Sequence, residues 1–207
     1  MIEALPKLFV LLFSIVLHEI AHGWMALKNG DPTARDAGRL TFNLIPHIDI
    51  FGTILLPLFL MIVQSPVLFG WAKPVPIDPR NFRNPRVGIG LVGAAGPGAN
   101  IILAVLAAIT FRVAVALGWI TGPGFVATML VYGVAINIIL AVFNMVPIPP
   151  LDGSRVIIPF APVGLRRVLA QLEPYGMFII FGLLYVGFFR FVISPIYLFF
   201  TRLFLGF

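Results

Sequence analysis

The 207-residue sequence contains no cysteine, which excludes disulfide bonds and thiolate metal ligands. Charged residues are also scarce, at 11% of the chain against about 25% in soluble globular proteins. Hydrophobic residues make up 60%, and the mean hydropathy is +1.05. Much of the chain must therefore contact lipid. The net charge is +6, but the basic residues lie between apolar runs, which is typical of membrane topology and not of nucleic-acid binding.

Five apolar stretches reach the ~20 residues that a helix needs to cross a bilayer. They cover about residues 5–27, 50–72, 88–117, 125–147 and 174–207. The last contains Arg190 and Pro195 and forms either one span with an interfacial helix or two short spans. The sequence thus predicts one membrane domain over residues 1–207, an all-α polytopic helix bundle of about 4–6 spans. Residues 38–43 alternate in polarity and predict a short strand or β-hairpin element.

The first apolar stretch contains the pattern His-Glu-x-x-His at His18, Glu19 and His22. Residues four apart share one face of a helix, so both imidazoles can bind one zinc ion. Glu19 lies beside them, where it can take a proton from water activated by the metal. The alternative is a polar cluster that is satisfied between helices. We favour the metal site because ionisable groups inside a membrane cost several kcal/mol and are usually functional.

Two histidines leave such a site one protein ligand short. Asp152 is the best candidate for the third, because it follows an apolar stretch that ends in Pro147, Pro149 and Pro150. Irregular backbone at membrane depth persists only where protein or a water-filled cavity surrounds it. The alternative role for Asp152 is that of a turn residue before Gly153.

Three motifs in this order resemble the site-2 protease family, and the chain is especially similar to its short prokaryotic members. They are His18-Glu19-x-x-His22, Gly96-Pro97-x-x-Asn100, and Asn144-x-x-Pro147-x-Pro149-x-Leu151-Asp152-Gly153. The resemblance covers about residues 8–190. It implies that His18, His22 and Asp152 bind zinc, that Glu19 is the general base, and that the substrates are transmembrane proteins. The short members usually have Asn-Pro before the loop histidine and His-Ile-Asp-Pro around it, and the segment around His47 departs from that pattern.

The topology follows from the ligands, since His22 and Asp152 must lie at the same depth. Both lie towards the C-terminal ends of their apolar stretches, so those two helices must run in the same direction. We therefore expect residues 50–72, which contain Pro57 and Pro66, to be re-entrant. This arrangement places ten basic residues on one side and Lys7 alone on the other. The positive-inside rule then predicts a multi-pass cell-membrane protein with an extracytoplasmic N-terminus and an active site towards the cytoplasm.

The remaining polar residues of the apolar stretches have less certain roles. Asn137 is expected to hydrogen-bond across helices, as most such amides do. Asn144, His47 and Asn100 are candidates for substrate binding, although Asn100 is equally a structural link between helices and His47 a hairpin residue. The proline-rich segment 73–80 offers an extended edge to a substrate strand.

Together these features predict an intramembrane zinc metalloprotease that binds one Zn²⁺ per chain and hydrolyses peptide bonds of transmembrane protein substrates. Its partners are the substrate and the lipid bilayer, with no nucleic acid; the sequence indicates no particular oligomeric state. The alternative is a membrane metal transporter or metal-binding protein without protease activity. The absence of a visible internal repeat argues against a transporter. A protease with a distal glutamate ligand and an inactive pseudo-protease are weaker alternatives.

Overall fold

The computed structural model describes residues 4–63 and 70–206, and this part of the chain is helical with no strand. Three helices are long and apolar enough to cross a membrane: α1 (Ala4–Lys28), α4 (Pro85–Ala116) and α5 (Phe125–Asn144). They correspond to the predicted spans 5–27, 88–117 and 125–147. The shorter helices are α2 (Thr33–Asp36), α3 (Leu56–Ile62), α6 (Asp152–Ile157), α7 (Val163–Leu172), α8 (Gly176–Tyr185) and α9 (Ser194–Leu205). Two π-helical segments, η2 (Ile50–Leu55) and η5 (Phe189–Ile193), and three 3-10 turns, η1 (Ile45–His47), η3 (Pro79–Asn81) and η4 (Glu173–Tyr175), complete the elements.

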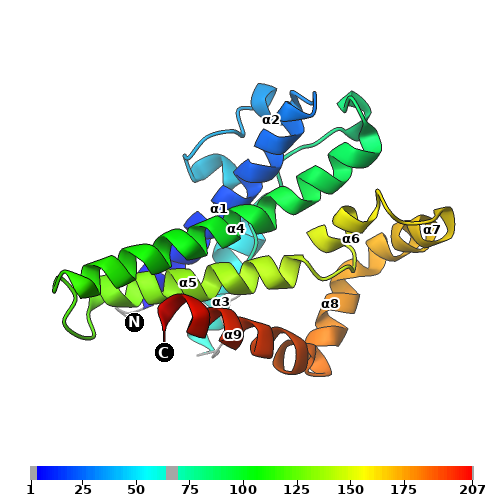
Figure 1. Cartoon of the computed structure of the whole chain (residues 1–207). Helices are drawn as coiled ribbons and strands as arrows, with labels where there is room; N and C mark the ends of the chain where they lie inside the picture. Colours follow the sequence, from blue (N-terminus) through cyan, green and yellow to red (C-terminus); the bar gives the residue numbers. More distant parts are fainter. Residues whose placement is uncertain (1–3, 64–69, 207) are drawn as a thin grey trace.

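The three long helices pack side by side: α4 contacts both α1 and α5, and α1 also contacts α5 (Figure 1). α1 and α5 run in the same direction, and α4 runs back against them (Figure 1). This is the relation between the apolar stretches 5–27 and 125–147 that the positions of His22 and Asp152 require. It brings the C-terminal half of α1 and the segment after α5 to the same end of the bundle.

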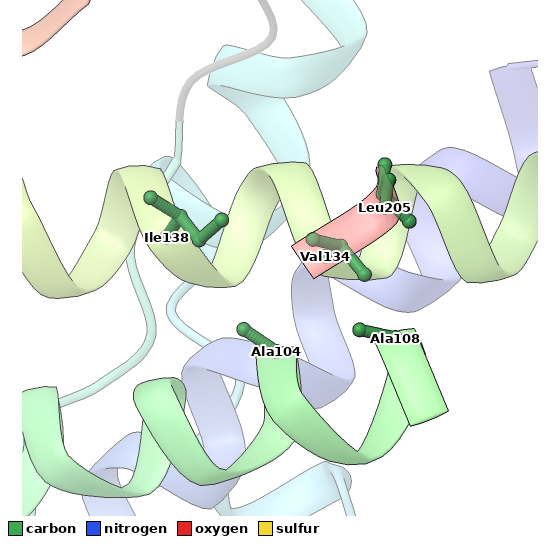
Figure 2. Packing of buried hydrophobic residues seen from close by; sticks show 5 residues of the cluster. All are labelled: Ala104, Ala108, Val134, Ile138 and Leu205. Atoms are coloured by element: carbon green, nitrogen blue, oxygen red, sulfur yellow. The ribbon is translucent and has the colours of Figure 1, made fainter. Parts of the chain in front are cut away.

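Small side chains let α4 and α5 approach closely. Ala104 and Ala108 of α4 face Val134 and Ile138 of α5, and Leu205 of α9 completes this cluster of buried side chains (Figure 2). All five are at most 5% exposed. In a membrane, helices associate through such close packing because lipid is as apolar as leucine.

The C-terminal stretch 174–207 forms two short helices, neither of them a candidate span. α8 has 10 residues and α9 has 12. The chain turns between them near Gly187, whose φ of +83° is a conformation that glycine adopts without strain. α9 then returns along α5 (Figure 1). The sequence predicts either one span with an interfacial helix or two short spans here, but neither α8 nor α9 is long enough to count as a span. The described residues therefore hold three candidate spans, fewer than the predicted four to six.

The segment that we expect to be re-entrant begins and ends at the same place. The Trp71 backbone N–H donates to the carbonyl of Gly52 over 3.1 Å, and the Thr53 hydroxyl donates to the carbonyl of Trp71 over 2.8 Å. The helical part, Ile50–Ile62, has too few residues to cross a bilayer. Residues 64–69 of this segment lie outside the described residues. Its position in the membrane stays a prediction.

The predicted strand over residues 38–43 is not present among the described residues. Local hydrogen bonds take its place: Thr41 Oγ1 accepts from Asn43 N–H, and Asn43 Oδ1 accepts from Ile45 N–H. Short polar side chains that bond their own backbone compete with strand pairing. The six-residue alternation alone does not supply a partner strand.

Candidate metal centre

α1 presents His18 and His22 on one face, one helical turn apart. Their side chains are buried, and the two Nε2 atoms lie 3.0 Å from each other. The rings meet edge to face. The i, i+4 spacing therefore brings the two imidazoles together as the sequence predicts.

α4 fixes the orientation of both rings. His18 Nδ1 lies 2.6 Å from Asn100 Oδ1, and His22 Nδ1 lies 2.7 Å from the carbonyl oxygen of Val92. Both partners are acceptors, so each Nδ1 must carry the proton that it donates. In the neutral rings, each Nε2 then carries a lone pair that faces the site. Contacts of this kind on the outer nitrogen are typical of metal-binding histidines.

Asp152 comes to the same place from the segment after α5. Its Oδ2 lies 3.1 Å from His18 Nε2 and 3.3 Å from His22 Nε2, and this buried oxygen has no hydrogen-bond partner. Asp152 is the first residue of α6, which packs directly on α4. A Cβ on Gly93 of α4 would lie 3.0 Å from the Asp152 carbonyl oxygen. The glycine thus lets α6 approach closely enough to deliver the carboxylate.

The three atoms fit a zinc ion. Two imidazole nitrogens and one carboxylate oxygen face each other at 3.0–3.3 Å. With both rings neutral, this arrangement is repulsive, and a cation among the three atoms would relieve the repulsion. Ligands at 2.0–2.1 Å around tetrahedral zinc are separated by roughly 3.3 Å. The observed separations match three ligands of such a site.

Gly96 of α4 closes one side of this group. A Cβ there would lie 2.4 Å from His22 Nε2 and 2.6 Å from His18 Nε2. Any side chain would therefore displace the imidazoles. The glycine of the Gly96-Pro97 motif is thus required by the site itself, a role that the sequence does not reveal.

Glu19 lies beside the histidines and is held by the extended segment that precedes η3. One carboxylate oxygen of Glu19 and one ring nitrogen from each histidine all lie within 4.8 Å of one another. Glu19 Oε2 accepts a hydrogen bond from the Val75 backbone N–H over 2.9 Å. Three further residues support the site through a backbone or small polar group: Val75, Val92 and Ser14. No sequence pattern identifies them.

A buried amide network supports the first histidine. Asn100 Nδ2 donates to Asn137 Oδ1 over 2.8 Å, and Asn137 Nδ2 donates to Ser14 Oγ of α1 over 2.8 Å. Asn137 therefore hydrogen-bonds across helices, and this prediction is confirmed. Asn100 is fully buried and contacts His18, so the structure places it as a link behind the metal site.

The other two substrate-binding candidates hydrogen-bond to nearby backbone carbonyls. Asn144 is half-buried, and its amide donates to the carbonyl of Leu140 one turn earlier in α5. His47 lies in η1, where its Nε2 is 3.1 Å from the carbonyl oxygen of Thr41. Burial lowers the pKa of His47, the contact with Thr41 opposes this, and the nearby charge of Arg39 lowers the pKa further. Substrate binding by Asn144, His47 and Asn100 stays a prediction.

The extended segment is fixed at its far end by Asp31, which lies in the loop after α1. Asp31 Oδ2 accepts from the Asp78 N–H over 2.8 Å, and Oδ1 accepts from the Asn81 amide over 2.9 Å. Burial acts to raise the pKa of Asp31, but the hydrogen bonds from Thr33, Asn81 and the backbone outweigh it and hold the pKa below its usual value. The exposed Arg80 guanidinium lowers the pKa of Asp78 to about 2.

Comparison with known proteins decides the family. A Bacillus subtilis (strain 168) protein described as "Putative zinc metalloprotease YwhC" is 39% identical over 189 residues, covering 89% of this chain and 82% of the relative. The chain belongs to the site-2 protease family. A Mycolicibacterium smegmatis (strain ATCC 700084 / mc(2)155) relative, "Putative zinc metalloprotease Rip2", is 28% identical over 177 residues, which are 84% of this chain and 64% of the relative. No family model and no solved structure matches the chain.

Membership in the site-2 protease family supports a metalloprotease of the membrane for this chain, and it supports zinc as the metal. The resemblance that the three sequence motifs carry is confirmed. Within the described residues, the group of His18, Glu19 and His22 is the place where histidine and carboxylate side chains gather as a metal site requires.

Proposed function

We propose that this member of the site-2 protease family is an intramembrane zinc endopeptidase that cleaves transmembrane protein substrates. One observation carries the proposal: three atoms that can bind a metal, His18 Nε2, His22 Nε2 and Asp152 Oδ2, converge at 3.0–3.3 Å beside the Glu19 carboxylate. The three atoms supply a binding site for one zinc ion per chain. The Glu19 carboxylate supplies a base.

The protein's part in zinc binding is to present the ligands with their lone pairs inward. Asn100 and the Val92 carbonyl hold the two Nδ1–H groups, so no tautomeric change is needed when the ion binds. When bound, zinc supplies Lewis-acid chemistry: it polarises a carbonyl and makes water acidic enough to lose a proton near neutral pH. Three protein ligands leave one position open, as catalytic zinc sites do.

Glu19 handles the protons of the reaction. Its carboxylate accepts a proton from the attacking water and passes it to the amine that leaves when the peptide bond breaks. The hydrogen bond from the Val75 N–H leaves the other carboxylate oxygen, Oε1, for this task. The extended segment thereby keeps the base in place without using its free oxygen.

The substrate segment must lose helical structure before it reacts, because every carbonyl inside a helix is already hydrogen-bonded. We therefore expect cleavage near helix-breaking residues or at the end of a span. The site belongs to the end of the bundle where α1 finishes and α6 begins, and the distribution of basic residues assigns that end to the cytoplasm.

The decisive experiment pairs two variants of the purified protein in proteoliposomes with a transmembrane substrate. Glu19→Gln should retain zinc at the wild-type stoichiometry and lose cleavage by roughly two to four orders of magnitude, the contribution of a general base. Asp152→Ala should lose both zinc and cleavage. Undiminished cleavage by Glu19→Gln, or full zinc occupancy in Asp152→Ala, contradicts the proposal.

The same proteoliposomes separate a protease from a metal transporter. A protease leaves zinc flux across the vesicle wall at the level of protein-free vesicles, while the substrate is cleaved. Zinc flux that requires His18 and His22, with the substrate left intact, would instead identify a transporter.

A further inference from the structure

A small apolar cavity lies between α1 and the segment we expect to be re-entrant. Its volume is about 300 Å³, at the lower end of the range for ligand sites. Leu8, Leu12 and Val16 of α1 form one wall, Pro57 and Met61 of α3 lie opposite, and His47 and Ala72 lie at its margin. None of the zinc-facing residues lines it.

The cavity lies on the same face of α1 as Glu19. Leu8, Leu12 and Val16 recur every fourth residue, and Glu19 falls on the same face at about 100° per residue. Val16 and Glu19 are separated by a rise of about 4.5 Å along the helix. Ala72 lines the cavity three residues before Val75, whose N–H binds Glu19. A peptide held at Glu19 therefore has this cavity within reach of a neighbouring side chain.

Two buried polar side chains line the cavity, and since Thr53 already donates to the Trp71 carbonyl, His47 is the one that indicates what the occupant must carry. His47 is 1% exposed, and its Nε2 donates to the Thr41 carbonyl, so Nδ1 holds a lone pair. Nδ1 has no hydrogen-bond partner in the described part of the chain. A buried acceptor left unpaired is costly, so an occupant that donates a hydrogen bond is favoured. A lipid acyl chain has no such donor, whereas an unwound peptide has free N–H groups.

We propose that this cavity is a specificity subsite that takes one bulky apolar side chain of the substrate next to the bond that is cleaved. His47 Nδ1 accepts a hydrogen bond from an N–H group of the same stretch of substrate. The assignment rests on the proposed protease function and adds a preference to it. The substrate class is a transmembrane segment with leucine, phenylalanine or a similar residue at one fixed distance from the cleaved bond.

Filling the cavity tests the preference. The reporters are single-span Leu/Ala peptides interrupted by Asn-Pro, in which each position near the interruption is in turn Ala, Leu or Phe. The wild type should favour Leu or Phe over Ala at one position by roughly tenfold in kcat/KM, the value of a filled apolar pocket. Leu12→Trp should lower kcat/KM for the Leu and Phe reporters to that of the Ala reporter and so abolish the preference. Leu106→Trp, the same change on an exposed face of α4, should keep it.

Two substitutions at His47 test the hydrogen bond. Asn places an oxygen where Nδ1 lies, and Gln places an amide where Nε2 lies, so only His47→Asn restores the acceptor. We expect His47→Asn to retain more of the wild-type kcat/KM for the preferred reporter than His47→Gln does. Equal values for the two variants contradict the role of Nδ1.

Cross-linking gives a readout that does not need turnover. A photoreactive benzoylphenylalanine at position 12 in the Glu19→Gln background should capture the preferred reporter, and the same group at position 106 should not. Capture of phospholipid alone at position 12, or equal slowing of all reporters by Leu12→Trp, overturns the subsite. If the wild type cleaves none of the reporters, the proposed function itself fails, which is a different result from cleavage without preference.

Discussion

The hydrogen bond between His18 and Asn100 determines which ring nitrogen faces Asp152. Replacing Asn100 with Leu leaves a buried N–H without an acceptor and frees the ring to turn or change tautomer. We predict that Asn100→Leu lowers zinc affinity about 10- to 100-fold, the usual effect of losing such a contact behind a metal ligand. Competition with a chelator of known affinity measures this on the purified protein.

Asn137→Ala is the matched control for this prediction. It disturbs the same amide network but leaves the acceptor of His18 in place. Its zinc affinity should therefore stay close to that of the wild type. Equal losses in the two variants would show that the network acts through general packing and not through the orientation of His18.

Gly96 and Gly98 lie two residues apart in α4 and offer a direct comparison. A Cβ at Gly96 would overlap the imidazoles, while a Cβ at Gly98 meets nothing within 4 Å. We predict that Gly96→Ala abolishes zinc binding, because both rings must move. Gly98→Ala should bind zinc normally and unfold at the same or a higher temperature, since alanine favours helix over glycine by about 1 kcal/mol. Zinc stoichiometry and thermal unfolding of both variants check this, and zinc bound by Gly96→Ala would refute it.

At the scale of elements, Asp31 fastens the extended segment that holds Glu19. In the folded protein, Asp31 Oδ2 accepts a hydrogen bond from the Asp78 N–H. Asparagine at position 31 would place its NH₂ group there instead, so that two donors would face each other. We predict that Asp31→Asn destabilises the protein at pH 7 by about 2 kcal/mol, the value of hydrogen bonds to a charged group. The exposed Asp36, whose partner is the neighbouring Arg35, is the control, and Asp36→Asn should change stability little.

The pH dependence of this stabilisation follows from the direction in which folding shifts the pKa of Asp31. The pKa of Asp31 is lower in the folded protein than its usual value, so its stabilisation is complete above about pH 4 and is lost as the pH falls through the folded-state pKa. The difference between wild type and Asp31→Asn should be constant from pH 7 to pH 5 and shrink below pH 4. Thermal unfolding in excess chelator measures it without a contribution from zinc. A difference that grows on acidification would contradict this assignment.

The elements also show which features the sequence can predict. The long helices follow from the length of the apolar runs, and the histidine pair follows from the i, i+4 spacing; both are local properties of the chain. The sequence indicates Asp152 because the histidine pair needs a third ligand and a proline-broken segment can supply it. The Val75 N–H and the close approach of Gly96 depend on packing between distant segments and leave no pattern. The strand predicted at residues 38–43 failed to form because Thr41 and Asn43 bond their own backbone.

For the whole molecule, the loops on either side of residues 50–72 are in direct contact. Asp31 binds the N–H of Asp78, and the Arg39 guanidinium donates to the carbonyl of Lys73 over 2.6 Å. A segment that crossed the bilayer completely would separate these loops by about 30 Å. The contacts therefore favour a segment that enters and leaves on one side, which is also the arrangement that collects ten basic residues there.

The absence of cysteine makes this topology directly measurable, because any introduced thiol is the only one in the chain. We predict that single cysteines at Asp36, Arg80 and Phe160 react with a membrane-impermeant maleimide from the cytoplasmic side only. A cysteine at Gly122, in the exposed turn between α4 and α5, should react from the opposite side. The comparison of positions 36 and 80 is decisive, since a full crossing of residues 50–72 would place them on opposite sides. It would also place Asp31 across the bilayer from Asp78, which their 2.8 Å hydrogen bond does not allow.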